Sequence, residues 1–209
     1  MDTLQQLDTT QLIALAATLG WASGLRLYAV LAITGLVGYA GWVQLPPGLQ
    51  LLQHPAMLTG SALMLFAEFF ADKIPGLDSL WDLVHTLLRI PAGAALAAGV
   101  FGADHATMAA VAALLGGTLA ATSHAAKASA RAAVNTSPEP FSNIGLSLLG
   151  DLAVPGMLWL AFEHPVLAIV AVSLAFVTML GVIWWLSKFL RRVWSRLKML
   201  LGLPSSTAA

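Results

Sequence analysis

Two stretches of the chain combine ionisable side chains with apolar sequence, and their residue types are the ones that could do chemistry. The first runs from residue 66 to 91 and carries acidic, basic and histidine side chains around a Pro-Gly break. The second runs from residue 124 to 155 and repeats that layout. A charged side chain at the centre of a bilayer costs about 2.5 to 3.5 kcal/mol on insertion scales, so it normally faces a partner or water. We therefore expect both stretches to line the polar interior of a membrane protein.

Helical spacing gathers these side chains onto shared faces. Glu68 and Asp72 are spaced by one helical turn and form an acidic face. Two further sets follow the i, i+3, i+7 spacing that places side chains on one face of a helix. In chain order, these sets are Asp82, His85 and Arg89, and then His124, Lys127 and Arg131. The last set gives the chain a basic face.

The simplest arrangement pairs the acidic face with the basic face across two helices. Glu68 and Asp72 would then contact Lys127 and Arg131. The remaining candidates for this binding or translocation site are Arg26, Lys73 and Asp151. These three residues would add two cations and one anion to the two faces.

Two interpretations of the pairing stay open. In the first, the ion pairs neutralise one another and hold closely packed helices in register. In the second, the charges line a hydrated cavity that binds or passes a small ion or solute, and His85 or His124 titrates near neutral pH. A metal site built from Glu68, Asp72, His85 and His124 is chemically allowed, but no HExxH or comparable signature supports it.

Catalysis finds little support in the sequence. The chain has no G-x-S-x-G, P-loop or paired catalytic motif. An intramembrane lipid-modifying activity would need His85 or His124 beside a nucleophile or a carboxylate. The chain also has no cysteine, which excludes disulfides, thiolate metal ligands and a cysteine nucleophile. We therefore expect no enzymatic activity, no cofactor and no bound metal.

The composition predicts a chain whose main solvent is lipid. Hydrophobic residues make up 58% of the 209 residues and charged residues only 10%, whereas a soluble domain has about 25% charged residues. The mean hydropathy is +0.82. So few charged side chains cannot coat a water-facing globule, and we expect one membrane-embedded unit.

Apolar runs and the positions of Gly and Pro predict the helices. Gly20, Ser23 and Gly24 predict a break between a short first helix and a full second one, and Asp78 and Ser79 are predicted helix N-caps. The expected helices cover residues 12–22, 25–42, 56–72, 80–102, a segment starting near 107, 144–162 and 166–186, with a polar loop at 135–143. We therefore predict an all-α polytopic membrane helix bundle of about six or seven membrane segments, some of them broken by Gly or Pro.

The last apolar segment and the residues that follow it differ in charge. The last span carries no charge and should be the most lipid-exposed helix. It is followed by Lys188, Arg191, Arg192, Arg196 and Lys198. Basic flanks mark the cytoplasmic side, so we expect residues 1–187 to form one transmembrane domain and 188–209 a basic cytoplasmic tail. The tail follows a Trp-Trp pair, which favours contact with membrane lipids and not with nucleic acid.

Internal similarity and small residues suggest two further features. Residues 56–102 and 107–162 share a layout of helix, polar turn, amphipathic half-helix, proline and apolar half-helix, which predicts two hairpin repeats of the same orientation. Gly35, Gly38 and Gly41 give one helix a smooth stripe suited to close packing. We expect such Gly-rich stripes to join copies of the chain into a homo-oligomer.

Three motifs resemble a known family. They are ASGLRLYAVLAITGL, AEFFADKIPGLDSLWDLVHTLLRIPAGAA and SHAAKASARAAVNTSPEPFSN. They look like the corresponding parts of an uncharacterised family of bacterial multi-pass membrane proteins, domain of unknown function 4126. The resemblance covers nearly the whole chain up to the last span. It implies a multi-pass protein of the bacterial inner membrane and carries no activity, substrate or catalytic residue.

The sequence thus favours transport or conduction of a small anionic solute or ion through a polar cavity between broken helices. An anion is favoured because the positive charges near the cavity are neutralised only if every acid of the site is paired with one of them. Protonation of a histidine would then make the net charge of the site positive. The alternative is a structural or assembly membrane protein whose intramembrane charges are all locked in ion pairs.

Overall fold

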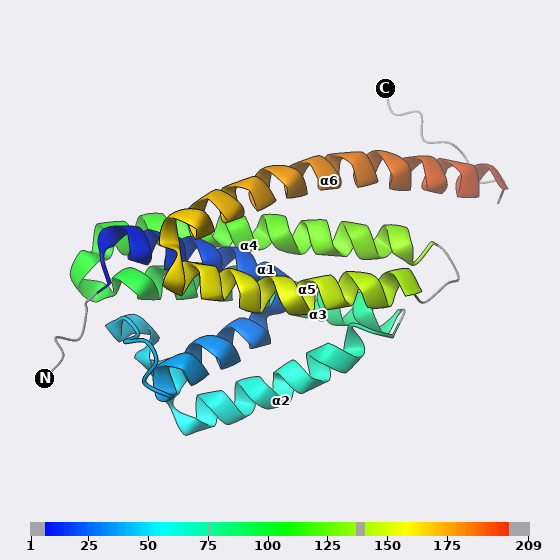
Figure 1. Cartoon of the computed structure of the whole chain (residues 1–209). Coiled ribbons are helices and arrows are strands. Elements are labelled where there is room, and N and C mark those ends of the chain that lie inside the picture. The colour runs from blue at the N-terminus through cyan, green and yellow to red at the C-terminus, as the bar shows by residue number, and fades with distance from the viewer. Residues whose placement is uncertain (1–6, 75, 137–140, 201–209) are drawn as a thin grey trace, which may run out of the picture.

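The computed structural model describes residues 7–74, 76–136 and 141–200, and all its regular elements in these ranges are helices (Figure 1). The six α-helices are α1 (Thr9–Tyr39), α2 (Pro55–Ala71), α3 (Leu77–Phe101), α4 (Ala106–Val134), α5 (Phe141–Glu163) and α6 (Pro165–Leu200), and the two short 3-10 helices are η1 (Pro47–Gln53) and η2 (Ala103–His105). All the α-helices except the 17-residue α2 are long and apolar enough to cross a membrane. The predicted all-α polytopic bundle is confirmed, and the chain is an integral membrane protein.

Helix α1 is broken at Arg26, whose φ of −146° and ψ of 79° are not helical. The half before the break runs along α4, where Gly20 packs against Gly116. The half after the break lies beside the start of α2, where Gly35 packs against Leu58. Helices α2 and α4 run in the same direction in Figure 1. The first half of α1 lies along α4, whereas its second half runs in the opposite direction along α2. Helix α1 is therefore a helical hairpin with Arg26 at its tip.

The break therefore lies two residues beyond the glycines that were predicted to cause it. Gly20 and Gly24 are helical and buried, and they serve close packing instead. A side chain at Gly24 would overlap Ser123 and the Ala120 carbonyl on α4. α1 packs against all five other α-helices and forms the centre of the bundle.

Five predicted boundaries are wrong. Helix α1 begins at Thr9 and ends at Tyr39, each three residues before the predicted bound. Helix α5 begins at Phe141, so 141–143 is helical and not loop, whereas 137–140 lies outside the described residues. Helix α3 begins at Leu77 with Gly76 as its N-cap, and Asp78 and Ser79 lie in its first turn. Helix α6 continues to Leu200 and includes most of the predicted tail, because no Gly or Pro interrupts these helix-forming residues.

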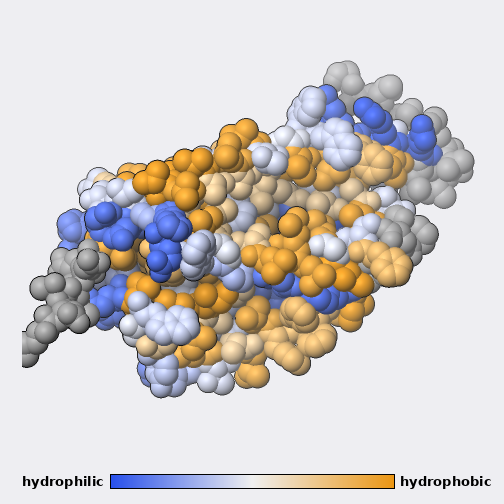
Figure 2. Space-filling view, in the orientation of Figure 1, coloured by the Kyte–Doolittle hydropathy of each residue, from blue (hydrophilic) through white to orange (hydrophobic). Residues whose placement is uncertain are grey.

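The surface carries the apolar side chains expected of a lipid-facing protein. Figure 2 shows apolar residues over much of one face, with hydrophilic residues at the two ends of the bundle and a smaller hydrophilic group within the apolar area. Leu87, Leu114 and Leu152 are among the most exposed large apolar side chains. Of the candidate spans, α6 has the smallest buried share, 11% of its most apolar 18 residues. This agrees with the expectation that the last span is the most lipid-exposed helix.

The predicted glycine stripe packs within the chain. Gly35 lies against the Leu52 carbonyl, and Gly38 lies against the Leu45 side chain. Gly41 has a positive φ of 74° just after α1, which is a conformation that favours glycine. The surfaces of Gly35 and Gly38 are therefore covered by residues of the same chain and are not free to contact a second copy. The homo-oligomer stays a prediction, and this stripe no longer supports it.

The two predicted hairpins, α2 with α3 and α4 with α5, run in the same direction (Figure 1). The chain passes from one end of the bundle to the other in α2 and α4 and returns in α3 and α5. This orientation agrees with the predicted parallel repeat, although the repeat itself stays a prediction.

Candidate functional site

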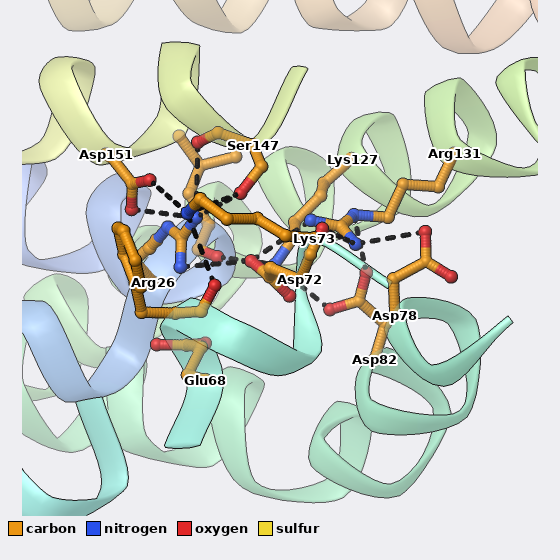
Figure 3. A network of polar contacts seen from close by, with 12 residues as sticks. Arg26, Glu68, Asp72, Lys73, Asp78, Asp82, Lys127, Arg131, Ser147 and Asp151 are labelled. Carbon is orange, nitrogen blue, oxygen red and sulfur yellow. Dashed lines mark hydrogen bonds and ion pairs between the residues drawn. The ribbon is translucent and has the colours of Figure 1, made fainter. Parts of the chain in front are cut away.

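One continuous network of ion pairs occupies the interior between α1, α3, α4, α5 and the C-terminal end of α2 (Figure 3). Its acids are Glu68, Asp72, Asp78, Asp82 and Asp151, and its cations are Arg26, Lys73, Arg89, Lys127 and Arg131. Five carboxylates and five cations give the network a formal charge of zero. It contains every charged residue that the sequence predicted for the site, together with Asp78.

Asp72 lies at the centre of this network. It is the C-cap of α2 and is fully buried. Its Oδ2 lies 3.1 Å from Arg26 Nη1, 3.0 Å from Lys127 Nζ and 3.0 Å from Arg131 Nη2. The close-up shows these three cations reaching Asp72 from α1 and α4 (Figure 3). The predicted contact of Asp72 with Lys127 and Arg131 agrees with this geometry.

Glu68 has a different partner from the one predicted. Its Oε1 lies 2.6 Å from Nη2 of Arg89, and both side chains are fully buried. Arg89 also donates through Nη1 to Oδ1 of Asp82 at 2.6 Å. The predicted pairing of Glu68 with Lys127 and Arg131 is therefore wrong. The spacing of Glu68 and Asp72 correctly placed Glu68 on the polar face of α2. The packing of α2 beside α3 then brings Glu68 closer to Arg89 than to the cations of α4.

The first turns of α3 add two carboxylates that face α4. Asp82 lies 3.1 Å from Lys127 Nζ and 3.3 Å from Arg131 Nε. Asp78 lies 3.1 Å from Arg131 Nη1 and accepts hydrogen bonds from the Asn135 side chain. This pairing was not predicted from the sequence, because Asp78 was interpreted as a helix cap. Its spacing of one turn from Asp82 was the signal that could have found it.

Helix α5 closes the network from another side. Asp151 lies 2.8 Å from Arg26 Nη2 and 3.0 Å from Lys73 Nζ. Ser147, one turn earlier, accepts a hydrogen bond of 2.9 Å from Arg26 and was not predicted. Lys73 also lies over the Phe69 ring, 3.1 Å from its centroid, which is a cation–π contact.

The break in α1 leaves backbone carbonyls that α4 satisfies. Helix ends carry carbonyl groups without an intrahelical partner, and these need other donors when they are buried. Ser123 donates to the Trp21 carbonyl at 2.7 Å, and Lys127 donates to the Leu25 carbonyl at 3.0 Å. Lys127 therefore donates a hydrogen bond to the backbone at the helix break and also forms ion pairs with the carboxylates.

The two predicted histidines border the network. His124 lies beside Arg89, with 3.2 Å between its Nδ1 and Arg89 Nη1, and its Nε2 lies 2.7 Å from the Thr86 hydroxyl. His85 stacks on Trp81 with 4.2 Å between the ring centroids and packs edge-on against Tyr28. Within the described ranges, no three histidine and acidic side chains come together as a metal site would require.

A cavity of about 330 Å³ lies against the network between α1, α4, α5 and α6. Its charged lining residues are Arg26, Asp72, Lys127 and Arg131, and most of its other lining residues are apolar. Leu149 also lines the cavity and is 65% exposed. The cavity therefore connects the buried charges with the outer surface of the bundle.

Comparison with models of known protein families identifies the family of this chain. The family described as domain of unknown function (DUF4126) matches residues 13–187. The chain belongs to this family. A search of curated proteins and a search of solved structures each found no match.

The DUF4126 match includes the whole ion-pair network and the cavity beside it. It ends within α6, just before Lys188. The basic C-terminal part of α6 lies outside the DUF4126 match. The resemblance to this family that the sequence motifs carried is confirmed.

Proposed function

We propose that the protein binds and moves a small anionic solute or ion at the cavity beside the ion-pair network. The observation that carries this proposal is the uneven placement of charge within a network whose formal charge is zero. Of the charged residues that line the cavity, three are cations and only Asp72 is an anion. The other carboxylates that contact these cations are Asp78, Asp82 and Asp151, and they are not among the lining residues. The cavity wall therefore attracts anions.

Two guanidinium nitrogens that form ion pairs but, among the described residues, no hydrogen bond support the same assignment. Arg26 Nη1 and Arg131 Nε lie close to carboxylates but make no hydrogen bond of good geometry within the described part of the chain. Both side chains are almost completely buried. Buried donors without a hydrogen bond are costly, and an anion in the cavity would supply acceptors for these two.

The broken helix gives a second line of support. Transporters commonly place discontinuous helices at the substrate site, because the interrupted backbone offers polar groups inside the membrane. In this protein the break occurs at Arg26, which is also a lining residue of the cavity. The tip of the α1 hairpin thus belongs to the proposed anion site.

The rival function is a structural or assembly role. It is favoured by the equal number of acids and cations and by the near-complete burial of Glu68, Asp72 and Arg89. Buried pairs of this kind are retained in some proteins because they hold elements in one register. Under this alternative the charges never separate and no solute passes.

Anion flux from proteoliposomes distinguishes the two functions. Ala130 lines the cavity without carrying charge, so Ala130→Leu should fill it and reduce efflux of chloride or nitrate by about tenfold. Ala132 is exposed and is not a lining residue, so Ala132→Leu is the matched control and should keep wild-type flux. Lys127→Gln should also reduce flux. Equal flux from the wild type, both leucine variants and protein-free vesicles would support the structural role.

We also propose an orientation in the bacterial inner membrane. Lys73, Arg131 and the basic end of α6 lie toward the same end of the bundle. Basic residues flanking membrane spans concentrate on the cytoplasmic side. This end therefore faces the cytoplasm in our proposal, and the turns at 46–54, 102–105 and 163–165 face outward.

A further inference from the structure

A second and larger cavity lies along the interface between α4 and α6. Its volume is about 470 Å³, and its lining includes Ile13, Met108, Leu115, Ile169, Phe176 and Val177. None of its lining residues carries a charged side chain. A space of this chemistry suits a hydrocarbon chain and not a hydrated ion, since an ion would lose its water without gaining polar partners.

The two cavities follow one another along the same pair of helices. On α4 the apolar cavity is lined by residues between 108 and 119, and the charged cavity by residues between 126 and 131. On α6 the corresponding ranges are 169–177 and 179–182. The α4 part of the apolar cavity extends roughly 16 Å at the helical rise per residue. This arrangement places a long apolar space next to a compact cationic one.

A contact from α1 to α6 lies in the wall of the charged cavity, close in sequence to the apolar one. The indole nitrogen of Trp21 lies 3.3 Å from the sulfur of Met179. Both residues line the charged cavity, and Met179 follows closely after Val177 of the apolar one. Methionine side chains adapt readily to neighbouring groups, so this contact can yield to an inserted chain.

We propose that the α4–α6 interface binds an anionic amphiphile with one oxyanion head and one hydrocarbon chain. The head lies beside Arg26, Lys127 and Arg131, and the chain occupies the apolar cavity. The inference rests on the proposed function, because the head uses the same cations as the anion site. It deepens that function by naming the class of substrate, which is a lipid-soluble anion that enters from the membrane.

Lateral entry agrees with the surroundings of both cavities. Helix α6 has the smallest buried share of the candidate spans, and Val177 of the apolar cavity is 66% exposed. Leu149 of α5 lines the charged cavity and is exposed, so this cavity reaches the outer surface beside α5. A molecule already dissolved in the bilayer would therefore reach the cations without crossing water.

Photocrosslinking tests the inference with palmitate that carries a diazirine near the end of its chain. Ser173 lines the apolar cavity, so Ser173→Trp should fill it and reduce crosslinking to α4 and α6 by about tenfold. The neighbouring Leu174 is 64% exposed and is not a lining residue, so Leu174→Trp is the matched control and should crosslink like the wild type. The corresponding neutral alcohol should crosslink at least about fivefold less than palmitate, since it lacks the anionic head.

The outcomes separate this inference from the proposed function. Equal crosslinking of the two tryptophan variants, or of palmitate and the alcohol, overturns the inference. If chloride or nitrate flux is lost in Ala130→Leu while palmitate fails to crosslink, the anion site stands and the amphiphile is excluded. If palmitate crosslinks as expected but neither palmitate nor small anions move across proteoliposomes, the binding site stands and transport is overturned. Size-exclusion profiles that match the wild type show that each variant is folded.

Discussion

Arg26 and Asp72 join the tip of the α1 hairpin to the C-terminal end of α2, with 3.1 Å between Nη1 and Oδ2. Both side chains are almost completely buried. The same carboxylate oxygen also contacts Lys127 and Arg131 on α4. One carboxylate therefore holds three elements together, and its removal would leave three buried cations without their shared partner.

Asp72→Asn should lower the free energy of unfolding by about 3–5 kcal/mol, because breaking a buried ion pair leaves an uncompensated charge. Asp104 is exposed on η2, so Asp104→Asn should change stability by less than about 0.5 kcal/mol. Reversible unfolding in mixed micelles provides the measurement. Similar losses for the two variants would contradict the central role of Asp72.

A double-mutant cycle should locate the true partner of Glu68. The cycle of Glu68→Gln with Arg89→Gln should give a coupling energy of about 1–3 kcal/mol, since the two groups are in direct contact. The cycle of Glu68→Gln with Arg131→Gln should give a smaller coupling, since these two groups have no direct contact and are linked only through Arg89 and Asp82. The reverse order of coupling energies would favour the pairing predicted from helical spacing over the one observed.

Gly24→Ala should destabilise the protein by about 1–3 kcal/mol, which is the usual cost of overpacking a tight interface. The added methyl group would overlap Ser123 and the Ala120 carbonyl. Gly60 on α2 has open space around it, so Gly60→Ala should be neutral or should stabilise the helix by up to about 1 kcal/mol. Thermal unfolding of the two variants under identical micelle conditions tests the contrast.

Single-cysteine labelling should detect the fold-back of α1. The chain contains no native cysteine, so each introduced thiol reports on one position. Cysteines at Thr9, Trp42 and Ala106 should react with a membrane-impermeant maleimide from the same side, because these positions lie at the same end of the bundle (Figure 1).

A cysteine at Ser137 should react only from the opposite side. Ser137 lies outside the described residues, but it follows the far end of α4 closely. Labelling of Thr9 and Trp42 from opposite sides would mean that α1 crosses the membrane once. Labelling of Ala106 and Ser137 from the same side would contradict the direction of α4.

Much of the fold was predictable because it follows from local sequence. Low charge and long apolar runs require lipid as the solvent, and Pro and Gly positions limit where helices end. The i, i+3, i+7 spacing on α4 correctly placed Lys127 and Arg131 on one face, since helical geometry alone determines that relation. The contact of Asp72 with these two cations followed from the need of buried charges to pair.

Tertiary structure decided which faces meet. Helical spacing assigns a side chain to a face but does not specify the helix packed against it, so the pairings of Glu68 with Arg89 and of Asp78 with Arg131 were not predictable. The fold-back of α1 at Arg26 depends on donors from Ser123 and Lys127, which are distant in sequence. The cavities likewise exist only because α6 packs across α4. The sequence alone determined a buried set of charges in a membrane bundle, and the packing of helices determined which charges face the cavity.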